Sequence, residues 1–261
     1  MKSLWFVFKE SELLLEQLGN DLFTIPLSDN PPTFINEGQQ VHEMEPTEEG
    51  IPVKTYSVDS STQLPLKHVY CDLRQSYYKL PNKYYLLAGK CREINYWDAH
   101  SQYCGVCGAP MKLHTNISKC CTHCANEVWP QLATAIIVLI YKGDEVLLVH
   151  AKNFKSNFYG LIAGFVETGE SLEEAVVREV REETALEIEE LRYFDSQPWP
   201  YPIGLMIGFT ARYKAGKLHL QEEELSAGGW FHRDHLPQIP EKLSLARKLI
   251  DHWLEQKPNT L

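Results

Sequence analysis

The strongest constraint on this chain lies between residues 164 and 186, which read GFVETGESLEEAVVREVREETAL. Apolar residues recur there at steps of three and four, the spacing of one buried helical face: Leu172, Ala175, Val176 and Val180. Ser171 and Glu174 form a capping-box pattern at the start of this helix. The segment therefore predicts a helix that begins just after Ser171.

Three glutamates, Glu179, Glu182 and Glu183, crowd the second half of this helix beside Arg178. Glu179 and Glu183 are i,i+4 neighbours, and such like charges repel by about 0.2–0.5 kcal/mol. Mg²⁺ binds a few carboxylates and leaves its other positions to water and substrate phosphates. An isolated pair of glutamates would favour a solvated helix face, whereas this cluster favours a divalent metal site.

The spacing around the helix is also specific. Gly164, five residues, Glu170, seven residues and then the run Arg178–Glu183 match the Nudix box. The segment resembles the catalytic loop and helix of a Nudix hydrolase, a family that cleaves nucleoside diphosphates linked to another group. The box usually carries glycine where this chain has Ala185. Because a left-handed helix end favours glycine, we expect local strain at that residue.

Two CxxC pairs, Cys104/Cys107 and Cys121/Cys124, are separated by thirteen residues, close to zinc-ribbon spacing. Four thiolates around one tetrahedral ion leave no open position for water, so we expect one structural zinc per chain. The other cysteines, Cys71, Cys91 and Cys120, are interpreted as small apolar residues.

Composition limits the class of protein. The 261 residues suffice for about two domains, and 44% hydrophobic with 23% charged residues indicate a folded chain. A net charge of −10 argues against a general basic surface for nucleic acid, although a local basic groove stays open. The N-terminal apolar run is too short for a signal peptide, the run 132–141 is too short to span a membrane, and the cysteines suit a reducing compartment. We expect a cytoplasmic enzyme without a membrane partner.

The pattern along the chain predicts an α+β fold with a mixed sheet flanked by helices. Expected boundaries are an N-terminal domain at 1–100, a zinc ribbon at 101–129 and a larger domain at 130–261. The N-terminal part predicts strands at Trp5–Phe8 and Tyr77–Leu87, a loop at Leu27–Thr47 and a helix at Glu93–Ser101. The C-terminal part predicts strands at Ala133–Tyr141, Glu145–His150, Ile188–Phe194, Gly204–Tyr213 and Gly229–His232, and a helix at Lys242–Gln256.

A second landmark is the segment Ser196–Pro202, in which three prolines surround Trp199 and Tyr201. Prolines restrict the backbone, so this loop is expected to hold its aromatic rings at low entropic cost. Composition supports two interpretations equally: a contact for a planar nucleobase or nicotinamide, or a strand connection packed on the core.

The SQPWP run follows a zinc ribbon and a Nudix box in that order, and the chain from about Arg74 to Ala246 closely resembles the NADH pyrophosphatases, the NudC-type branch of the Nudix hydrolases. The resemblance implies a Nudix α/β/α sandwich preceded by a zinc ribbon and a small N-terminal α+β domain. It also implies hydrolysis of NAD(H) to nicotinamide mononucleotide and AMP, removal of NAD caps from RNA in bacterial members, and a homodimer that shares the substrate site.

The resemblance also implies the site residues. Mg²⁺ or Mn²⁺ would bind the carbonyl of Ala163 with Glu179, Glu183 and Glu224, while Glu182 and Arg178 complete the catalytic set. The substrate contacts carried over are Arg74, Trp129, Phe165, Gln197, Pro198, Trp199, Pro200, Tyr201, Pro202, Ile203, Gly204 and Ala246.

Three further positions depart from the family. Gly204 replaces a common serine, Trp129 a usual tyrosine and Asn116 an acidic residue, which loosens any preference among dinucleotides. One alternative is therefore another nucleoside diphosphate derivative, such as ADP-ribose or diadenosine polyphosphate. The other is a non-catalytic zinc-ribbon regulator that binds nucleic acid, although such a protein would be expected to lose a box glutamate and this chain keeps all of them.

Overall fold

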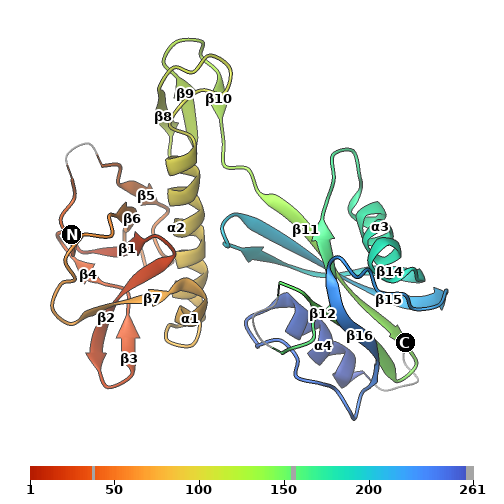
Figure 1. Cartoon of the computed structure of the whole chain (residues 1–261). Coiled ribbons are helices and arrows are strands. Elements are labelled where there is room, and N and C mark those ends of the chain that lie inside the picture. Colours follow the sequence, from red (N-terminus) through yellow and green to blue (C-terminus); the bar gives the residue numbers. More distant parts are fainter. Residues whose placement is uncertain (37–38, 154–156, 257–261) are drawn as a thin grey trace. The chain divides into compact units, whose positions relative to one another are not determined.

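The computed structural model describes residues 1–36, 39–153 and 157–256, which form two compact units (Figure 1). The first unit comprises Met1–Gln131 together with Pro200–Ile203, and the second comprises Leu132–Trp199 together with Gly204–Leu261. Within the described ranges, no helix has both the length and the apolar character needed to cross a bilayer.

The second unit is built on a six-stranded mixed sheet. Strand β11 pairs in parallel with β15 and antiparallel with β12 and β13, and the order across the sheet is β14-β15-β11-β12-β16. The strands are β11 (Ala133–Lys142), β12 (Glu145–Ala151), β13 (Ile162–Phe165), β14 (Glu187–Trp199), β15 (Gly204–Ala215) and β16 (Leu225–His232), and the helices are α3 (Leu172–Thr184) and α4 (Leu245–Glu255).

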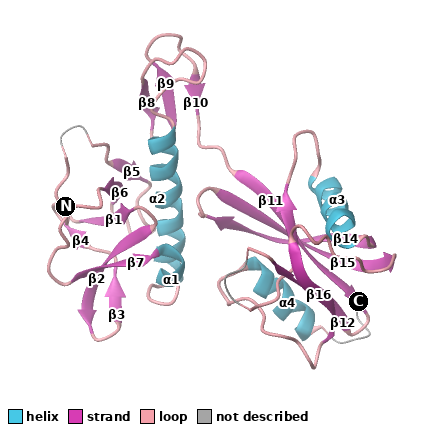
Figure 2. Ribbon diagram, in the orientation of Figure 1, coloured by secondary structure: helices cyan, strands magenta, loops and turns pink. Residues whose placement is uncertain are grey.

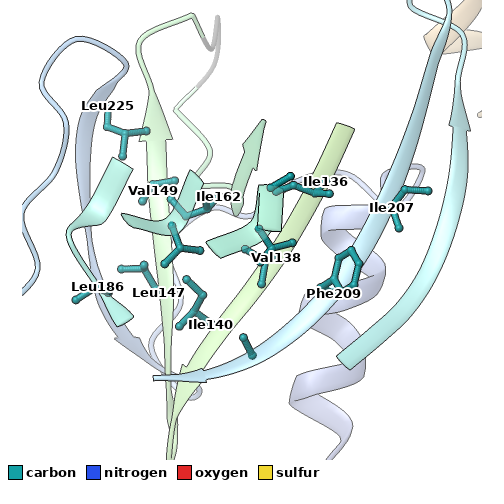
Figure 3. Packing of buried hydrophobic residues seen from close by; sticks show 14 residues of the cluster. Ile136, Val138, Ile140, Leu147, Val149, Ile162, Leu186, Ile207, Phe209 and Leu225 are labelled. Carbon is teal, nitrogen blue, oxygen red and sulfur yellow. The ribbon is translucent and has the colours of Figure 1, made fainter. Parts of the chain in front are cut away.

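The two faces of this sheet are covered by different helices. Successive side chains of a strand point to opposite faces, and β11 follows this rule. Ile136, Val138 and Ile140 pack in one core with α3, and Figure 3 shows these three side chains among the other residues of that core. Ile137 and Leu139 pack in another core with α4. Figure 2 shows the two helices on opposite sides of the sheet. The predicted α/β/α sandwich is confirmed.

Helix α3 begins as the sequence predicts. The Ser171 hydroxyl accepts from the backbone N–H of Glu174, and the Glu174 carboxylate accepts from the backbone N–H of Ser171 at 2.8 Å. Ala175, Val176 and Val180 are buried against the sheet. The helix is therefore held at its start by a capping box and along one face by apolar packing.

The same helix ends at Ala185 in the left-handed conformation, with φ of 55°. The strain predicted at this residue is thus located at the helix C-cap. A following segment closes over the helix end, since the N–H groups of His219 and Gln221 donate to the carbonyls of Thr184 and Glu183. These hydrogen bonds satisfy carbonyls that a helix end otherwise leaves without partners.

The proline-aromatic segment is not wholly a loop. Strand β14 continues through Trp199, so Ser196, Gln197 and Pro198 belong to a strand and only residues 200–203 form the turn. Because β14 is the edge strand of the sheet, a proline can be accommodated there without breaking a central ladder. The predicted strand at Gly229–His232 is likewise longer and begins at Leu225.

The first unit contains a seven-stranded sheet with the order β3-β2-β1-β6-β5, to which β4 and β7 add at β1 and β2. A mixed core of residues such as Phe6, Leu13 and Cys91 lies between this sheet and α2. The strands are β1 (Ser3–Lys9), β2 (Glu12–Gly19), β3 (Leu22–Thr24), β4 (Leu27–Ser28), β5 (His42–Met44), β6 (Val53–Val58) and β7 (His68–Asp72), and the helices are α1 (Leu73–Ser76) and α2 (Asn82–His100).

One N-terminal prediction is wrong. The segment Tyr77–Leu87 is not a strand, because a turn leads into α2, which begins after Pro81. Its tyrosines favour strands by propensity, but Tyr85, Ala88 and Cys91 are buried at helical spacing. The predicted helix at Glu93–Ser101 is the second half of α2, and the predicted loop at Leu27–Thr47 contains the short strands β4 and β5, with residues 37–38 outside the described ranges.

The cysteine-rich segment folds as a small sheet of β8 (Met111–Thr115), β9 (Ser118–Cys121) and β10 (Glu127–Val128). A buried lysine joins it to α2. The Lys119 ammonium lies 2.6 Å from the Asp98 carboxylate and also donates to the Ser101 carbonyl, while His42 approaches the other Asp98 oxygen at 3.3 Å. Removing one partner of such a buried pair would leave an uncompensated charge.

The left-handed Ala185 predicts the effect of restoring the usual glycine. A left-handed L-residue costs about 1–2 kcal/mol, part of which glycine loses again through its freer unfolded state. We expect Ala185→Gly to stabilise the protein by about 1 kcal/mol and raise the melting temperature by about 2–4 °C in a calorimetric scan. Ala99→Gly, within the right-handed helix α2, is the control and should lower stability; a loss of stability in both variants would contradict the expectation.

Candidate active site

Arg178 on α3 organises the acidic residues around it. Its guanidinium carries five N–H donors. They donate to Glu170 at 2.6 and 3.0 Å, to Glu179 at 2.8 Å, to Glu182 at 3.1 Å and to the Phe165 carbonyl at 2.9 Å. These charge-assisted bonds hold the pKa of Arg178 above its ordinary value, most strongly through Glu170. One side chain therefore ties the helix, the loop before it and the end of β13 together.

Glu170 is a positioning residue that the predicted site set did not include. Both of its carboxylate oxygens accept from Arg178, and one also accepts from the Glu167 N–H at 3.0 Å. The hydrogen bond to Arg178 is the main reason that the pKa of Glu170 is lowered. The signal for this role was present in the sequence as the fixed gap between Gly164 and Glu170.

Gly164 makes room for Glu179. A Cβ built on this glycine would overlap the Glu179 carboxyl group, so no larger residue fits without displacing that side chain. Gly164 pairs with Ile136 of β11, which fixes its backbone within the sheet. The glycine of the box thus lets a carboxylate on α3 approach the backbone of β13 closely.

Glu183 is the most deeply buried member of the acidic cluster, with 4% of its surface exposed. Burial raises its pKa to about 8, and the negative charges of Glu179, Glu224 and Glu182 add to this shift. Burial likewise raises the pKa of Glu179, against the opposing effect of Arg178. Arg178 hydrogen-bonds the carboxylates of Glu179 and Glu182 but not that of Glu183.

Glu224 reaches the same place from a distant part of the chain. The Gln221 N–H donates to the Glu183 carbonyl at 2.9 Å, the Glu224 N–H donates to the Gln221 carbonyl at 3.3 Å, and the Glu224 carbonyl accepts from Lys152 at 2.8 Å. Backbone bonds therefore connect Glu183 to Glu224 through Gln221. Both Glu179 and Glu183 feel the charge of Glu224, so the structure brings these three predicted residues together.

The carboxylates fit a divalent cation. A buried carboxyl without a cationic partner is costly, and three neighbouring carboxylates make its ionisation costlier. Oxygen donors of this kind are the ligands that Mg²⁺ and Mn²⁺ prefer. Ala163, whose carbonyl is the fourth predicted ligand, is exposed on β13 opposite Ile137.

Phe165 lies two residues after Ala163 on the same strand, with 67% of its surface exposed. Residues two apart on a strand share a face. Phe165 and Ala163 therefore point away from the face on which Ile162 packs in the α3 core. An exposed aromatic ring on the residue that follows Gly164 is available for stacking on a planar ligand.

Five other predicted contacts lie elsewhere in the second unit: Gln197, Pro198, Trp199, Gly204 and Ala246. Gln197 on β14 is buried and donates to the Leu243 carbonyl, and Ala246 in the first turn of α4 is half-buried in the second core. Gly204 pairs with Trp199 at the end of the hairpin. A Cβ at position 204 would lie 2.8 Å from the Trp199 carbonyl, so a larger residue fits here only if that carbonyl shifts.

The remaining predicted contacts belong to the first unit, to which the turn Pro200–Ile203 is assigned. Tyr201 packs against the core of that unit, its hydroxyl lies 3.0 Å from that of Tyr85, and the Arg74 guanidinium lies 4.9 Å from its ring centre. A Cβ on Gly89 would lie 3.0 Å from Pro200. The turn is thus packed on α2, as one of the two sequence interpretations expected, while Trp129 is 52% exposed after β10.

The four predicted cysteines form a compact sulfur cluster, and all four sulfur atoms lie within 4.8 Å of one another. The closest pairs are 3.4, 3.5 and 3.6 Å apart, near the spacing of about 3.8 Å expected for four sulfurs at about 2.3 Å from zinc. Backbone N–H groups of Cys107 and Val106 lower the pKa of Cys104 to about 6. Such donors favour the thiolate form that binds metal.

Comparison with known proteins agrees with this geometry. Residues 130–253 match the model of the NUDIX domain, and residues 2–97 match that of the NADH pyrophosphatase-like rudimentary NUDIX domain. A Nitrosomonas europaea NUDIX hydrolase structure aligns with a TM-score of 0.52 at 19% identity, covering 60% of this chain and 92% of that one, which supports the fold.

Sequence relatives extend over more of the chain. A Pseudomonas aeruginosa protein named NAD-capped RNA hydrolase NudC is 39% identical over 211 residues, which cover 80% of this chain and 75% of the relative. A protein of the same name from Pectobacterium carotovorum is 43% identical over 166 residues, covering 63% of this chain and 64% of the relative.

The buried Glu183 predicts a pH dependence of stability in metal-free protein. Its pKa is about 8 in the fold against an ordinary 4.5, so its stabilising contribution is complete below about pH 4.5 and is lost as the pH rises through about 8. We expect Glu183→Gln to flatten the fall in unfolding free energy between about pH 5 and 8, measured by urea titration in EDTA. Glu182→Gln, at a half-exposed carboxylate, is the control; parallel profiles for parent and Glu183→Gln would refute the assignment.

The sulfur cluster predicts zinc content. Protein purified without chelator should carry one zinc per chain by elemental analysis, and Cys104→Ser or Cys121→Ser should lose it together with thermal stability, because four thiolates close the site. Cys120→Ser changes a neighbouring cysteine outside the cluster and should retain the metal. Zinc-free parent protein, or zinc loss in Cys120→Ser, would be inconsistent with the four-sulfur site.

Proposed function

Because this chain belongs to the NudC branch of the Nudix hydrolases, we propose that it hydrolyses the diphosphate bond of NAD(H) to nicotinamide mononucleotide and AMP. We include the removal of NAD caps from RNA, the activity for which its relatives are named, since a capped transcript presents the same diphosphate. In both reactions water adds to one phosphorus and the bridging P–O bond breaks, leaving two phosphate monoesters.

The observation that carries the proposal is the buried Glu183 carboxyl among Glu179, Glu182 and Glu224. A protein without need of a metal would gain stability by replacing that acid with an apolar residue. We assign Glu179, Glu183 and Glu224 with the Ala163 carbonyl to Mg²⁺ or Mn²⁺. Bound there, such ions neutralise the diphosphate and lower the pKa of a coordinated water.

The chain's own residues orient these ligands. Arg178 holds Glu179 through one N–H and Glu170 through two, so it fixes the carboxylate that faces Gly164 instead of touching substrate. Glu182, which also accepts from Arg178, keeps the outer end of the cluster in place. The acidic residues are therefore preorganised before substrate arrives, which is the condition for electrostatic catalysis.

For the substrate we propose contacts from Phe165, from residues 198–204, from Ala246, and from Arg74 and Trp129. The exposed rings of Phe165 and Trp129 support stacking on a base or nicotinamide. We further propose one structural zinc at the four cysteines, a homodimer as the family resemblance implies, and a cytoplasmic location. The last rests on seven cysteines that form no disulfide bond, as suits a reducing compartment.

Product analysis tests the substrate. Purified enzyme with Mg²⁺ or Mn²⁺ should convert NADH to AMP and reduced nicotinamide mononucleotide. It should release nicotinamide mononucleotide from an NAD-capped transcript and leave a 5′-monophosphate RNA end. Comparing kcat/KM for NADH, NAD⁺, the capped transcript and ADP-ribose ranks the candidates. A larger value for ADP-ribose than for any NAD-containing substrate would favour another Nudix activity.

Glu183→Gln tests the site itself. The amide keeps the size of the side chain but removes the charge that would bind metal, so we expect kcat to fall by about a hundredfold or more with unchanged folding by circular dichroism. Glu173→Gln, on the exposed first turn of the same helix, is the matched control and should keep normal activity. Near-normal turnover by Glu183→Gln would remove Glu183 from the mechanism.

A further inference from the structure

Gln197 makes a contact that its predicted role as a substrate ligand does not explain. Its side chain is buried, with 7% of its surface exposed, and its Nε2 donates to the Leu243 carbonyl at 2.7 Å. Leu243 directly precedes Ser244, the N-cap of α4. The bond therefore joins strand β14 to the start of a helix 46 residues further along the chain.

The direction of the amide follows from its partner. A backbone carbonyl can only accept, so the NH₂ group faces Leu243 and the Oε1 atom points away. That Oε1 is buried and, within the described parts of the chain, has no donor. Burying an acceptor in this way is unfavourable, and an apolar side chain of equal length would avoid it. Only a polar side chain at this position can donate a hydrogen bond to the Leu243 carbonyl.

Other contacts at this junction are of a different kind. Leu245 of α4 packs over Gly208 of β15, where a Cβ would lie 3.1 Å from it. Lys248 lies 3.4 Å from the Asp195 carboxylate, but both side chains are half-exposed and such pairs contribute little. Packing alone leaves a helix free to shift along the sheet, whereas the directional bond from Gln197 sets where α4 begins.

We propose that Gln197 is a positioning residue that holds the first turn of α4, and with it Ala246, in register with the end of β14. The dinucleotide would then meet Ala246 and Trp199 at a fixed spacing without touching the Gln197 amide. This rests on the proposed function, because only a substrate lying near both residues makes their spacing matter for catalysis.

Two variants separate positioning from direct contact. Gln197→Met can neither donate nor accept, while Gln197→Glu keeps an acceptor oxygen but sets a carboxylate against the Leu243 carbonyl. We expect both to raise KM for NADH about tenfold, a change of about 1.4 kcal/mol, with kcat within about threefold and the Mg²⁺ dependence unchanged. Gln197→Glu should be at least as impaired as Gln197→Met. A purely structural defect would instead lower the active fraction, and so kcat, at constant KM.

Hydrogen–deuterium exchange on the full chain gives a readout independent of activity. Residues 244–248 should exchange faster in both variants, while α3 stays unchanged. Lys248→Gln, which removes the exposed ion pair, is the control and should leave KM and exchange as in the parent.

A normal KM for NADH in Gln197→Glu together with a raised KM in Gln197→Met would show direct contact through Oε1 and overturn the proposal. Unchanged exchange at α4 in both variants would also overturn it, and so would an equally large effect of Lys248→Gln on KM or exchange. If the parent cleaves no dinucleotide, the proposed function fails while the exchange experiment still tests the contact.

Discussion

The arrangement of the site depends on one guanidinium group. All five N–H donors of Arg178 are engaged, and their acceptors come from the loop before α3, from the end of β13 and from α3 itself. A lysine could not replace it, because an ammonium group has three donors and no planar fork for the two oxygens of Glu170. Arg178 also offsets the repulsion among carboxylates that have to lie together. Its hydrogen bonds reach Glu179 and Glu182 but not Glu183. The negative charge without a cationic partner is therefore that of the most buried acid in the cluster.

At two glycines of the second unit, the backbone lies so close to a neighbouring group that a side chain would not fit. A side chain at Gly164 would overlap the Glu179 carboxyl, and one at Gly204 would lie 2.8 Å from the Trp199 carbonyl. Ala185 shows the opposite case, a residue with a side chain in a conformation that suits glycine. The segment 219–221 closes the end of α3 by backbone hydrogen bonds, and these bonds also carry Glu224 to the cluster. The strained C-terminal end of α3 at Ala185 thus lies next to the backbone hydrogen bonds that connect Glu183 to Glu224, two of the proposed metal ligands.

Local patterns in the sequence predicted the second unit and the sulfur cluster of the first unit well, because both follow simple spacings. The α3 capping box, the strand β11 and the paired cysteines each follow from neighbouring residues. Long-range contacts were out of reach. Nothing near Gln197 in the sequence indicates that its partner is Leu243, and the tyrosines of 77–87 predict a strand because their propensity outweighs the weak periodicity of α2. Glu224 was found only through family resemblance, since three consecutive glutamates offer no local reason to choose the third.

Burial decides between an enzyme and a non-catalytic regulator more strongly than the presence of the glutamates does. Surface acids can persist in a protein that has lost its activity, because they cost almost nothing there. Glu183 is different, since it is almost fully buried, its pKa is raised to about 8, and three neighbouring carboxylates oppose its ionisation. Replacing it with an apolar residue would remove a standing cost to stability. A chain under selection for folding or for nucleic-acid binding alone has no reason to keep this residue, whereas a chain that binds a divalent cation at the cluster does.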